Sequence, residues 1–440
     1  MVNDITQINP ISMDRIVKPK SIQDIQEAIR NSKGQISIGG GRYSMGGQTA
    51  IESGIQIDMR EMNKILLLDI KNKRITVESG IRWRDIQETI DPHNLSVKIM
   101  QTYSNFTVGG SLSVNAHGRY VGEGPIIRSV ESIKIVLANG SVVEADSKNN
   151  SEIFFSSIGG YGGIGVIAEV TLNLVMNEKI ENRFDEMSLN DYRKYFNANI
   201  KNNPDYIFHN GDLYPPEFSK VMAVSWKKST KPLSIQDRLQ PRDKKYFLQP
   251  LAVGVIAVLP GGKRAREKYL DPYRAKKQSV VWRNYEASYD VAELEPLHRK
   301  ISTYVLQEYF IPVSQLESFV PKMKKVFNDH KVNVVNVSIR HSLPDSGSVM
   351  AWAREEVFSL VVYIRQGVRE KDKLHAKDWT RIMLDEVLSV GGTYYLPYQI
   401  NATKEQFQKA YPNYKQFFLT KNKVDPSGRF SNKLWEEYLK

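Results

Sequence analysis

The 440-residue chain contains no cysteine, which excludes disulfides, thiolate metal sites and cysteine nucleophiles. Long apolar runs are also missing, because no stretch approaches the roughly 20 residues that span a bilayer. The first 20 residues, MVNDITQINPISMDRIVKPK, lack the apolar centre of a secretory signal. We therefore expect a cytoplasmic location, and we predict no metal site.

Hydrophobic residues make up 41% of the chain and aromatic residues 10%. At this length such a chain buries a substantial core and forms two or three domains. The composition therefore predicts a globular protein.

The net charge of +12 is concentrated in one segment. Residues 226–280 hold 14 Lys and Arg against 4 Asp and Glu, around the short apolar stretch FLQPLAVGVIAVLPGG. Basic flanks beside a short apolar element suit contact with a membrane surface or with an anionic lipid substrate. A basic surface loop beside a buried strand or helix explains the same pattern. We predict no nucleic-acid partner, because the segment lacks the repeated aromatic residues of a stacking platform.

Glycine is concentrated after a short apolar run in ISIGGGRYSMGGQTA, residues 36–50. Without Cβ atoms, Gly39, Gly40 and Gly41 let backbone amides approach a bulky anion such as a phosphate, although a tight turn explains the run equally well. A strand, a helix over 22–32 with Ser21 at its start, and a second strand precede the loop. The glycines lead into another strand rather than a helix, which argues against a classical NAD fold, and a P-loop ending is absent.

Two further glycine-rich stretches follow, TYSNFTVGGSLSVNAHGRY at 102–120 and SSIGGYGGIGVIAEVTLNLV at 156–175. Between them, ESIKIVLANGSVVEA is predicted to be a hairpin with Asn139 and Gly140 at its turn. Three glycine-rich loops beside strands, within about 130 residues of one another, indicate a long ligand that is cradled by backbone.

The order GGGRYS (39–44), TVGG-x-x-SVNAHG (107–118) and GG-x-GG-x-G-VI (159–167) resembles the flavin-binding domain of the vanillyl-alcohol oxidase family. The C-terminal GGTYYLPYQINATKEQFQKAYPNYKQFFLTKNKVDPSGRFSN strengthens the resemblance. Within that superfamily the chain resembles the branch of aldonolactone oxidases, alditol oxidase and decaprenylphosphoryl-ribose oxidase. The resemblance covers roughly residues 10–178 and 300–440 and is much weaker between them.

The resemblance implies an α+β protein with a PCMH-type FAD-binding domain of two α/β subdomains and an antiparallel-sheet substrate (cap) domain. By position, we expect the FAD-binding domain at 1–178 and the cap at 179–392, with the basic apolar insertion near 227–280. Residues 393–440 are expected to return to the FAD-binding domain.

The resemblance also implies which residues bind FAD. The pyrophosphate would be held by backbone amides of the first loop, at Gly39, Gly40, Gly41, Arg42, Tyr43 and Ser44. The second loop would lie along the cofactor through Thr107, Gly109, Gly110, Ser113 and His117, with Gly165 and Ile167 near the adenosine and Tyr395 near the flavin. Several relatives attach FAD covalently to a histidine where this chain has Tyr43, so we predict non-covalent FAD. For His117 a purely structural role is the alternative to hydrogen bonding.

Enzymes of this kind move a hydride from a carbon bearing a hydroxyl to flavin N5, while a nearby group takes the hydroxyl proton. VLQEYFIPVSQL resembles a cap strand that places Glu308 and Tyr309 near the site, the alternative being an edge-strand carboxylate in water. VNVSIRHSLPD resembles a strand with Glu-x-Arg facing the substrate. Here Ser338 replaces the carboxylate and Arg340 remains, either facing the substrate or in a structural ion pair, with His341 on the opposite side of the strand.

TYYLPYQIN resembles a segment in which the ribose oxidase has a substrate-binding lysine, and Tyr398 stands at that position. A tyrosine donates a hydrogen bond readily, whereas acting as a base is demanding for a group with a pKa near 10. The candidate catalytic set is therefore Arg340, Tyr398, Glu308 and His117.

The leading hypothesis is an FAD-dependent oxidoreductase acting on a CH–OH group of a sugar-like, aldonolactone or polyol substrate, free or linked to a lipid phosphate. Oxygen or a quinone would accept the electrons, and a peripheral position at the inner face of the membrane suits the basic insertion. The alternative is a membrane-associated protein that keeps the flavin fold without catalysis.

Overall fold

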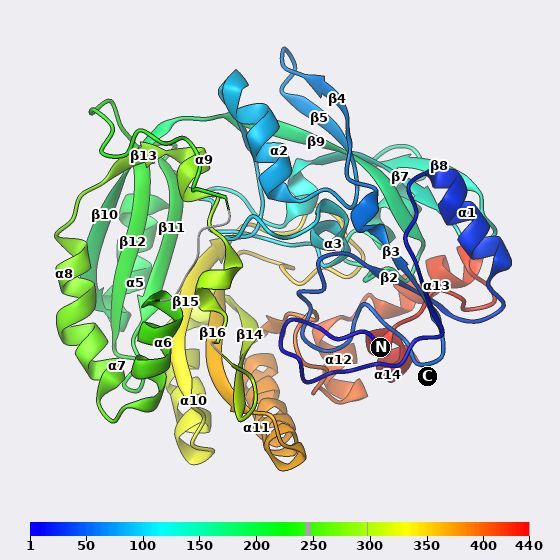
Figure 1. Cartoon of the computed structure of the whole chain (residues 1–440). Helices are drawn as coiled ribbons and strands as arrows, with labels where there is room; N and C mark the ends of the chain where they lie inside the picture. Colours follow the sequence, from blue (N-terminus) through cyan, green and yellow to red (C-terminus); the bar gives the residue numbers. More distant parts are fainter. Residues whose placement is uncertain (243–247, 297, 440) are drawn as a thin grey trace.

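The computed structural model describes residues 1–242, 248–296 and 298–439. It is an α+β fold with three sheets, two in one half of the molecule and one large sheet in the other (Figure 1). The three glycine-rich loops lie in the half that contains both termini.

The first sheet is parallel, in the order β1-β3-β2, with β1 at Arg15–Val17, β2 at Ile36–Gly39 and β3 at Ile55–Asp58. Helix α1 (Ile22–Asn31) connects β1 to β2. It begins where Ser21 accepts a hydrogen bond from the amide of Asp24 at 3.1 Å, as predicted. The first glycine-rich loop therefore follows the buried strand β2, which is held in place by its pairing with β3.

The second sheet is antiparallel and carries the other two glycine-rich loops. Its main path is β4 (Ile65–Asp69), β5 (Arg74–Glu78), β9 (Val166–Met176), β7 (Val130–Val136) and β8 (Val142–Asp146), with β6 (Leu95–Val97) paired to β9. Helices α2 (Trp83–Ile90), α3 (Val108–Ser113) and α4 (Ser151–Ser157) belong to this part. The predicted hairpin is β7 and β8, and Gly140 takes a φ of +81° at its turn.

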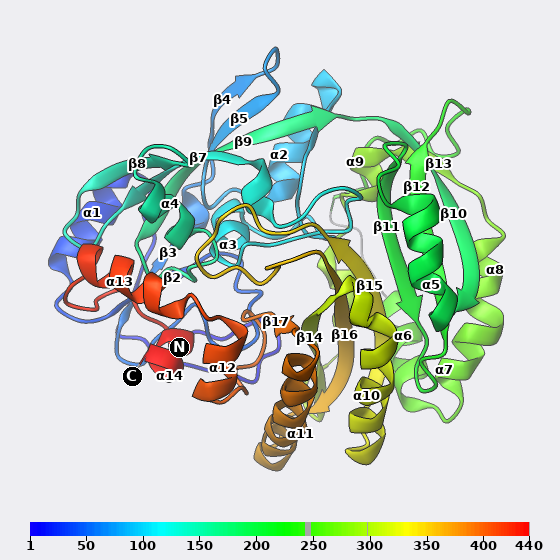
Figure 2. The same cartoon turned by 180° about the vertical axis from the view of Figure 1, so that it is seen from behind.

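The third sheet is the cap. Its strands run in the order β13 (Val280–Trp282), β10 (Lys179–Ser188), β12 (Lys220–Lys228), β11 (Tyr206–Leu213), β15 (Val334–Ser342), β16 (Val357–Gly367), β14 (Ser302–Pro312) and β17 (Thr393–Tyr394). Every neighbouring pair is antiparallel. Helices α5 (Leu189–Tyr195), α10 (Leu316–Asp329) and α11 (Glu370–Ser389) cover one face (Figure 2). The opposite face is left for the site.

The basic segment forms short helices on that opposite face: α6 (Leu248–Val258), α7 (Gly262–Ala265) and α8 (Asp271–Ala275), followed after β13 by α9 (Arg283–Glu286). Asn333, beside β15, donates a hydrogen bond to the carbonyl of Ala257 at 3.0 Å, and Arg266 donates one to Asn336 at 3.0 Å. The segment is thus attached to the cap sheet. Among the described residues, no helix is both long and apolar enough to cross a membrane.

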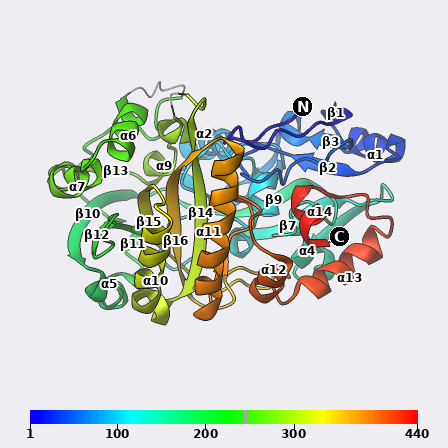
Figure 3. The ribbon, with the colours of Figure 1, turned by 90° about the horizontal axis from the view of Figure 1, so that it is seen from below.

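The C-terminal residues return to the first half through α12 (Lys404–Ala410), α13 (Tyr414–Val424) and α14 (Lys433–Leu439) (Figure 3). Three buried side chains donate to carbonyls of the third glycine-rich loop: Lys421 to Gly163 at 2.9 Å, Asn432 to Tyr161 at 2.7 Å and Trp435 to Gly160 at 3.1 Å. The C-terminal residues therefore hold the third glycine-rich loop in place.

Candidate active site

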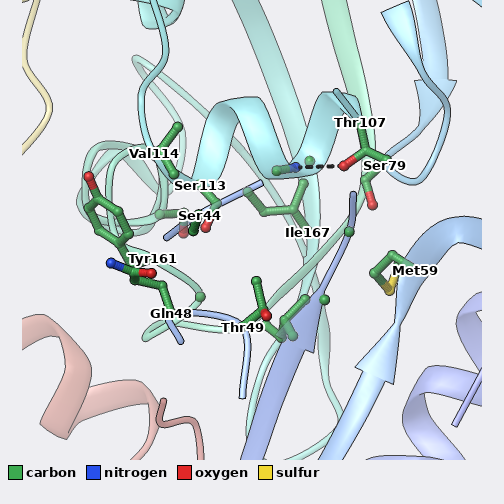
Figure 4. Close-up of a pocket in the computed structure, with 18 of the residues that line it drawn as sticks. Ser44, Gln48, Thr49, Met59, Ser79, Thr107, Ser113, Val114, Tyr161 and Ile167 are labelled. Carbon is green, nitrogen blue, oxygen red and sulfur yellow. Dashed lines mark hydrogen bonds between the residues drawn. The ribbon is translucent and has the colours of Figure 1, made fainter. Parts of the chain in front are cut away.

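The three glycine-rich loops meet around one cavity (Figure 4). Nine of the predicted cofactor residues line it: Gly39, Gly40, Ser44, Thr107, Gly109, Gly110, Ser113, Gly165 and Ile167. Loops that are more than a hundred residues apart in sequence thus share one binding space.

The glycines are required where the loops closely approach other parts of the chain. A Cβ atom at Gly109 would lie 2.8 Å from Cβ of Ser79, and one at Gly165 would lie 2.6 Å from the carbonyl oxygen of Val136. At Gly40 a Cβ would collide with the hydroxyl of Thr107. These positions leave backbone, not side chain, at the cavity wall.

Sequence reasoning missed several lining residues, which are Ile38, Gln48, Thr49, Met59, Ser79, Val114, Ser157, Tyr161, Gly162 and Ile164. Gln48 had the clearest signal, because it follows a second Gly-Gly pair within the first glycine-rich stretch. Its amide donates to the carbonyls of Leu396 at 2.8 Å and Tyr398 at 2.6 Å, which joins the cavity to the C-terminal segment.

Five predicted cofactor residues do not line this cavity: Gly41, Arg42, Tyr43, His117 and Tyr395. Arg42 has a φ of +60°, and its guanidinium forms an ion pair with Asp58 at 3.1 Å. Its side chain therefore stabilises the loop through Asp58 and does not line the cavity. Tyr43 packs edge-on against Phe106, with ring centroids 4.6 Å apart, and burial raises the pKa of its phenol to about 12.

His117 and Tyr395 belong to a second cluster, built around Glu308 of β14. Nε2 of His117 lies 2.5 Å from Oε1 of Glu308, Ser359 of β16 donates to the same oxygen, and the hydroxyl of Tyr398 donates to Oε2 at 3.1 Å. Glu308 is 3% exposed, and β14 lies between β16 and β17. An edge-strand carboxylate in water is therefore the wrong description of Glu308.

The contacts of His117 fix how a proton is held in this cluster. Nδ1 lies 3.1 Å from the carbonyl oxygen of Gly118, which only accepts, so Nδ1 carries a hydrogen. Nε2 then faces a carboxylate oxygen, and a proton must lie between the two groups. Burial alone would raise the pKa of Glu308, but His117, the cation of Arg340 and the Ser359 hydrogen bond together lower it.

Arg340 of β15 lies on the same face of the sheet as this cluster. It stands directly opposite Ser359, whose hydroxyl bonds to Glu308. In the described part of the chain no hydrogen bond or ion pair holds its guanidinium, and Nε is buried without a partner. The structural ion pair considered for Arg340 is therefore absent from these residues, and the cation is available to a ligand.

Two neighbours of the predicted residues face the other way. His341 bonds to Glu356 at 2.6 Å and packs against Phe196 on the helix-covered face, as the alternation along a strand predicts. Tyr309 packs against Phe319 of α10, 6.4 Å between ring centroids. The expectation that Tyr309 lies near the site is wrong, because it follows Glu308 on the same strand and points to the opposite face.

The tyrosines at the site remain neutral. Burial and the neighbouring Glu308 raise the pKa of Tyr398 well above its ordinary value, so it acts as a hydrogen-bond donor to that carboxylate. Burial likewise raises the pKa of Tyr395, whose buried hydroxyl has no partner among the described residues. A phenolate base at Tyr398 is therefore unfavourable.

Tyr161 links the cavity to the cluster. Its side chain lines the cavity, and burial raises the pKa of its phenol, with the nearby charge of Glu308 raising it further. The cavity and the cluster around Glu308 are therefore neighbours that Tyr161 connects.

A glycine-walled cavity that continues to a buried imidazole–carboxylate pair beneath a cap sheet defines a PCMH-type flavin-dependent oxidoreductase. The sequence comparisons agree: the FAD binding domain model matches residues 13–146, and the D-arabinono-1,4-lactone oxidase model matches residues 217–439, half of the chain. The chain belongs to the D-arabinono-1,4-lactone oxidase family, the aldonolactone branch that its motifs resemble.

Two individual relatives are named as a lactone oxidase and a lactone dehydrogenase. L-gulonolactone oxidase of Bos taurus is 22% identical over 435 residues, which cover 96% of this chain and 94% of that protein. L-galactono-1,4-lactone dehydrogenase 2, mitochondrial, of rice (Oryza sativa subsp. japonica) is 29% identical over 192 residues, covering 42% and 33%. The protein is an FAD-dependent oxidoreductase acting on CH–OH donors. Nothing supports the alternative of a flavin fold without catalysis.

The residues present fit FAD. The glycine positions that exclude a Cβ leave room for backbone to approach a pyrophosphate, and the orphan hydroxyl of Tyr395 lies at the flavin end of the site that the resemblance predicts. When bound, FAD supplies the hydride acceptor for oxidation of a carbon bearing a hydroxyl. The cavity-lining residues named above would hold it.

Proposed function

We propose that this protein oxidises a sugar lactone at a CH–OH group, with Arg340 and the Glu308–His117 pair acting on the hydroxyl. The observation that carries the proposal is the guanidinium of Arg340, which has no partner in the described part of the chain and lies on the same sheet face as a buried carboxylate that holds a proton with His117. The lactone as substrate class is inferred from the names of the relatives and of the family.

In this proposal Arg340 binds the substrate oxygen and stabilises negative charge as it develops there. A buried cation whose N–H donors meet no acceptor among the described residues suits an oxyanion, because such donors are effective where water is excluded. Glu308 lies near enough for Arg340 to lower its pKa, so cation and carboxylate can act on the same hydroxyl.

The pair of Glu308 and His117 takes the hydroxyl proton. Each oxygen of Glu308 already accepts a hydrogen bond, Oε1 from Ser359 and His117 and Oε2 from Tyr398. We infer that Oε2 receives the proton, because its single donor, Tyr398, is free to turn its hydroxyl hydrogen away. Tyr398 then orients the carboxylate and does not act as the base.

This arrangement also accounts for Ser338, which occupies the carboxylate position of the Glu-x-Arg pattern in the resembled oxidases. Glu308 stands two strands away on β14, and Ser359 on the intervening strand β16 faces both Arg340 and Glu308. We propose that the carboxylate is supplied from β14 in this chain, so that the same pair of charges is kept on a different strand.

The test is anaerobic reduction of the purified holoenzyme by individual lactones, read as bleaching of the visible flavin absorption. D-arabinono-1,4-lactone, L-gulonolactone and L-galactonolactone form the panel, with sorbitol as a polyol. Bleaching by at least one lactone and not by sorbitol supports the proposal. Reduction by the polyol alone, or by none of the four, would contradict it.

We further propose that FAD is bound without a covalent link. Tyr43 stands where resembled oxidases have a flavin-bearing histidine, its ring packs on Phe106, and its phenol is neutral at ordinary pH. Acid precipitation is therefore expected to leave yellow flavin in the supernatant. Flavin that remains in the pellet would contradict this part of the proposal.

The proposed electron acceptor is oxygen or a quinone, since the relatives include both oxidases and dehydrogenases. Mixing the reduced holoenzyme with air-saturated buffer, and separately with a soluble quinone under argon, separates the two. The acceptor that restores the visible spectrum at the faster rate is the one that the enzyme uses.

A second proposal concerns a membrane surface and a lipid-linked substrate. The helices of 248–276 expose seven large apolar side chains, namely Leu251, Val255, Val258, Leu259, Tyr269, Leu270 and Tyr273. Exposed basic residues lie among them, including Lys268, Arg274 and Lys276. Apolar and basic side chains together suit the interface of an anionic bilayer.

Flotation with phosphatidylglycerol vesicles tests this second proposal, with phosphatidylcholine vesicles as the neutral comparison. The protein is expected to float with the anionic vesicles, and a Leu259→Asp, Tyr273→Asp double variant is expected to remain at the bottom of the gradient. Flotation that both substitutions leave unchanged would contradict a membrane role for the segment.

A further inference from the structure

The site face of the cap sheet continues well beyond Arg340. Along β15, Asn336, Ser338 and Arg340 are half-buried, whereas the residues between them are buried. Along β11 the same alternation leaves Asn210 and Asp212 half-buried. Since side chains alternate between the faces of a strand, these five residues share one face of the sheet.

The register places these residues side by side. Asp212 stands directly opposite Ser338, and the antiparallel ladder continues from this pair toward Asn210 and Arg340. Across the sheet, Glu308 of β14 stands opposite Val361 of β16, which stands opposite Ser338. Glu308 and Asp212 are therefore three strand spacings apart, about 14 Å, with Arg340 between them.

The carboxylate of Asp212 makes only long contacts with its neighbours. Its carboxylate lies 3.3 Å from the amide nitrogen of Asn210, 3.5 Å from that of Asn336 and 3.6 Å from the guanidinium of Arg266. Its side chain is still 23% exposed. Burial raises the pKa of Asp212, and Arg266 opposes that shift. The acceptor capacity of this carboxylate is thus only partly used by the protein.

The basic segment, through Arg266, borders this polar face of the cap sheet beside Asp212. Arg266 bonds to Asp271 at 2.9 Å and to Asn336 at 3.0 Å, and its guanidinium lies 5.7 Å from the centre of the Tyr214 ring. Tyr214 in turn donates to Asp271 at 3.1 Å. Arg266 is thereby fixed beside Asp212, and the half-exposed polar face ends at a charged wall contributed by the segment 248–276.

We propose that Asn210, Asp212 and Asn336, closed off by Arg266, form a subsite that recognises hydroxyl groups on the part of the substrate remote from the reacting carbon. Carboxylate, amide and guanidinium groups on one face present both acceptors and donors, which is the complement of a polyhydroxylated ligand. The inference rests on the proposed lactone oxidation and specifies its substrate class: a lactone that carries a further hydroxylated unit.

The length of the face supports an extended ligand. A single lactone ring with its reacting hydroxyl at Arg340 and Glu308 is shorter than the distance of about 14 Å between Glu308 and Asp212. A glycosyl-substituted lactone spans it. Asp212 is accordingly a specificity-determining residue and takes no part in the proton transfer.

The experiment compares lactobionolactone, which carries a galactosyl unit, with D-arabinono-1,4-lactone. Steady-state kinetics and calorimetric binding to the holoenzyme are measured for both lactones. The wild type is expected to favour lactobionolactone at least tenfold in kcat/KM. Asp212→Ala is expected to remove this preference through KM, with kcat and the kinetics on D-arabinono-1,4-lactone within twofold of wild type.

Asn336→Ala provides a second variant on the neighbouring strand in case Asp212→Ala fails to fold, and Glu186→Ala, a surface carboxylate of β10 paired with Lys220, is the matched control. A wild type without preference, or equal losses on both lactones, would overturn the subsite. Binding of lactobionolactone that depends on Asp212, without flavin reduction by any lactone, would instead overturn the proposed oxidation and leave the subsite supported.

Discussion

The imidazole of His117 and the carboxylate of Glu308 meet at 2.5 Å although 191 residues separate them in the chain. His117 comes from the second glycine-rich loop, in the cofactor half, and Glu308 from β14, the strand next to the edge of the cap sheet. Their contact therefore exists only when the two halves are correctly packed. It ties the proton-handling part of the proposed reaction to the flavin-binding loops.

Replacing Glu308 by Gln is expected to slow flavin reduction by the substrate by about 10²–10⁴-fold, the range for loss of a general base. Glutamine keeps the shape and accepts hydrogen bonds, but it cannot take up a proton. Stopped-flow reduction under anaerobic conditions measures the rate, and the absorption spectrum reports FAD content. Glu355→Gln, at an exposed position on the same half of the molecule, is the control. An unchanged rate in Glu308→Gln would remove the carboxylate from the chemistry.

Gly40→Val is expected to abolish FAD retention. Any Cβ at this position collides with the hydroxyl of Thr107, which itself lines the cavity. Gly34→Val is the matched control, because nothing lies within 4 Å of a Cβ built there. Flavin content per protein after gel filtration distinguishes them. Full flavin occupancy in Gly40→Val would show that FAD does not use this loop.

Trp435→Phe is expected to weaken FAD binding by about tenfold. The indole donates to the carbonyl of Gly160 in the third glycine-rich loop, and phenylalanine fills most of the same space without that donor. Loss of one buried hydrogen bond corresponds to about 1 kcal/mol. Fluorescence titration of the apoprotein with FAD gives the dissociation constant. Trp379→Phe, on α11 in the cap, should leave it unaltered, and equal effects of the two changes would argue against a specific role of the C-terminal residues.

His209 is expected to make stability depend on pH in the acid range. Burial lowers its pKa to about 3, and its ring nitrogens lie 2.9 Å from the hydroxyls of Tyr192 and Ser225. Between pH 3 and pH 6.5 the unfolded chain binds a proton that the folded chain refuses. The free energy of unfolding therefore falls as the pH drops through this window, by a few kcal/mol.

Urea unfolding of wild type and of His209→Gln at pH 7 and pH 4.5 measures the contribution of His209. Glutamine does not titrate, so the variant is expected to lose less stability than wild type on acidification. The same pH dependence in both proteins would assign the acid sensitivity to other groups.

Much of the cofactor half could be predicted from the sequence, because local signals fix it. Ser21 begins a helix, Asn139 and Gly140 make a hairpin turn, and the glycine-rich loops follow strands whose apolar patterns are plain. Because these local signals also place the glycine-rich loops, nine predicted cofactor residues line one cavity. Gln48 and Tyr161 were missed, since a loop side chain that turns inward carries no periodic signal.

The cap was less predictable because its chemistry depends on register between distant strands. Glu308 and Arg340 were named from resemblance, but nothing local indicates that Ser359 stands between them or that Tyr309 points away. Arg42 was expected to hold the cofactor through its backbone, and nothing local indicates that Asp58 on a neighbouring strand holds its side chain. The wall made by Arg266 likewise follows from tertiary packing alone.

The most direct test of the account is the rate of anaerobic flavin reduction by a lactone substrate in Arg340→Ala, compared with wild type at equal FAD content. Arg183→Ala, an exposed arginine of β10 that is paired with Asp185, is the control. The account predicts a loss of about 10²–10³-fold in Arg340→Ala, with FAD still bound and the control unaffected. Reduction of Arg340→Ala at the wild-type rate would contradict the central claim that the Arg340 cation acts on the substrate hydroxyl.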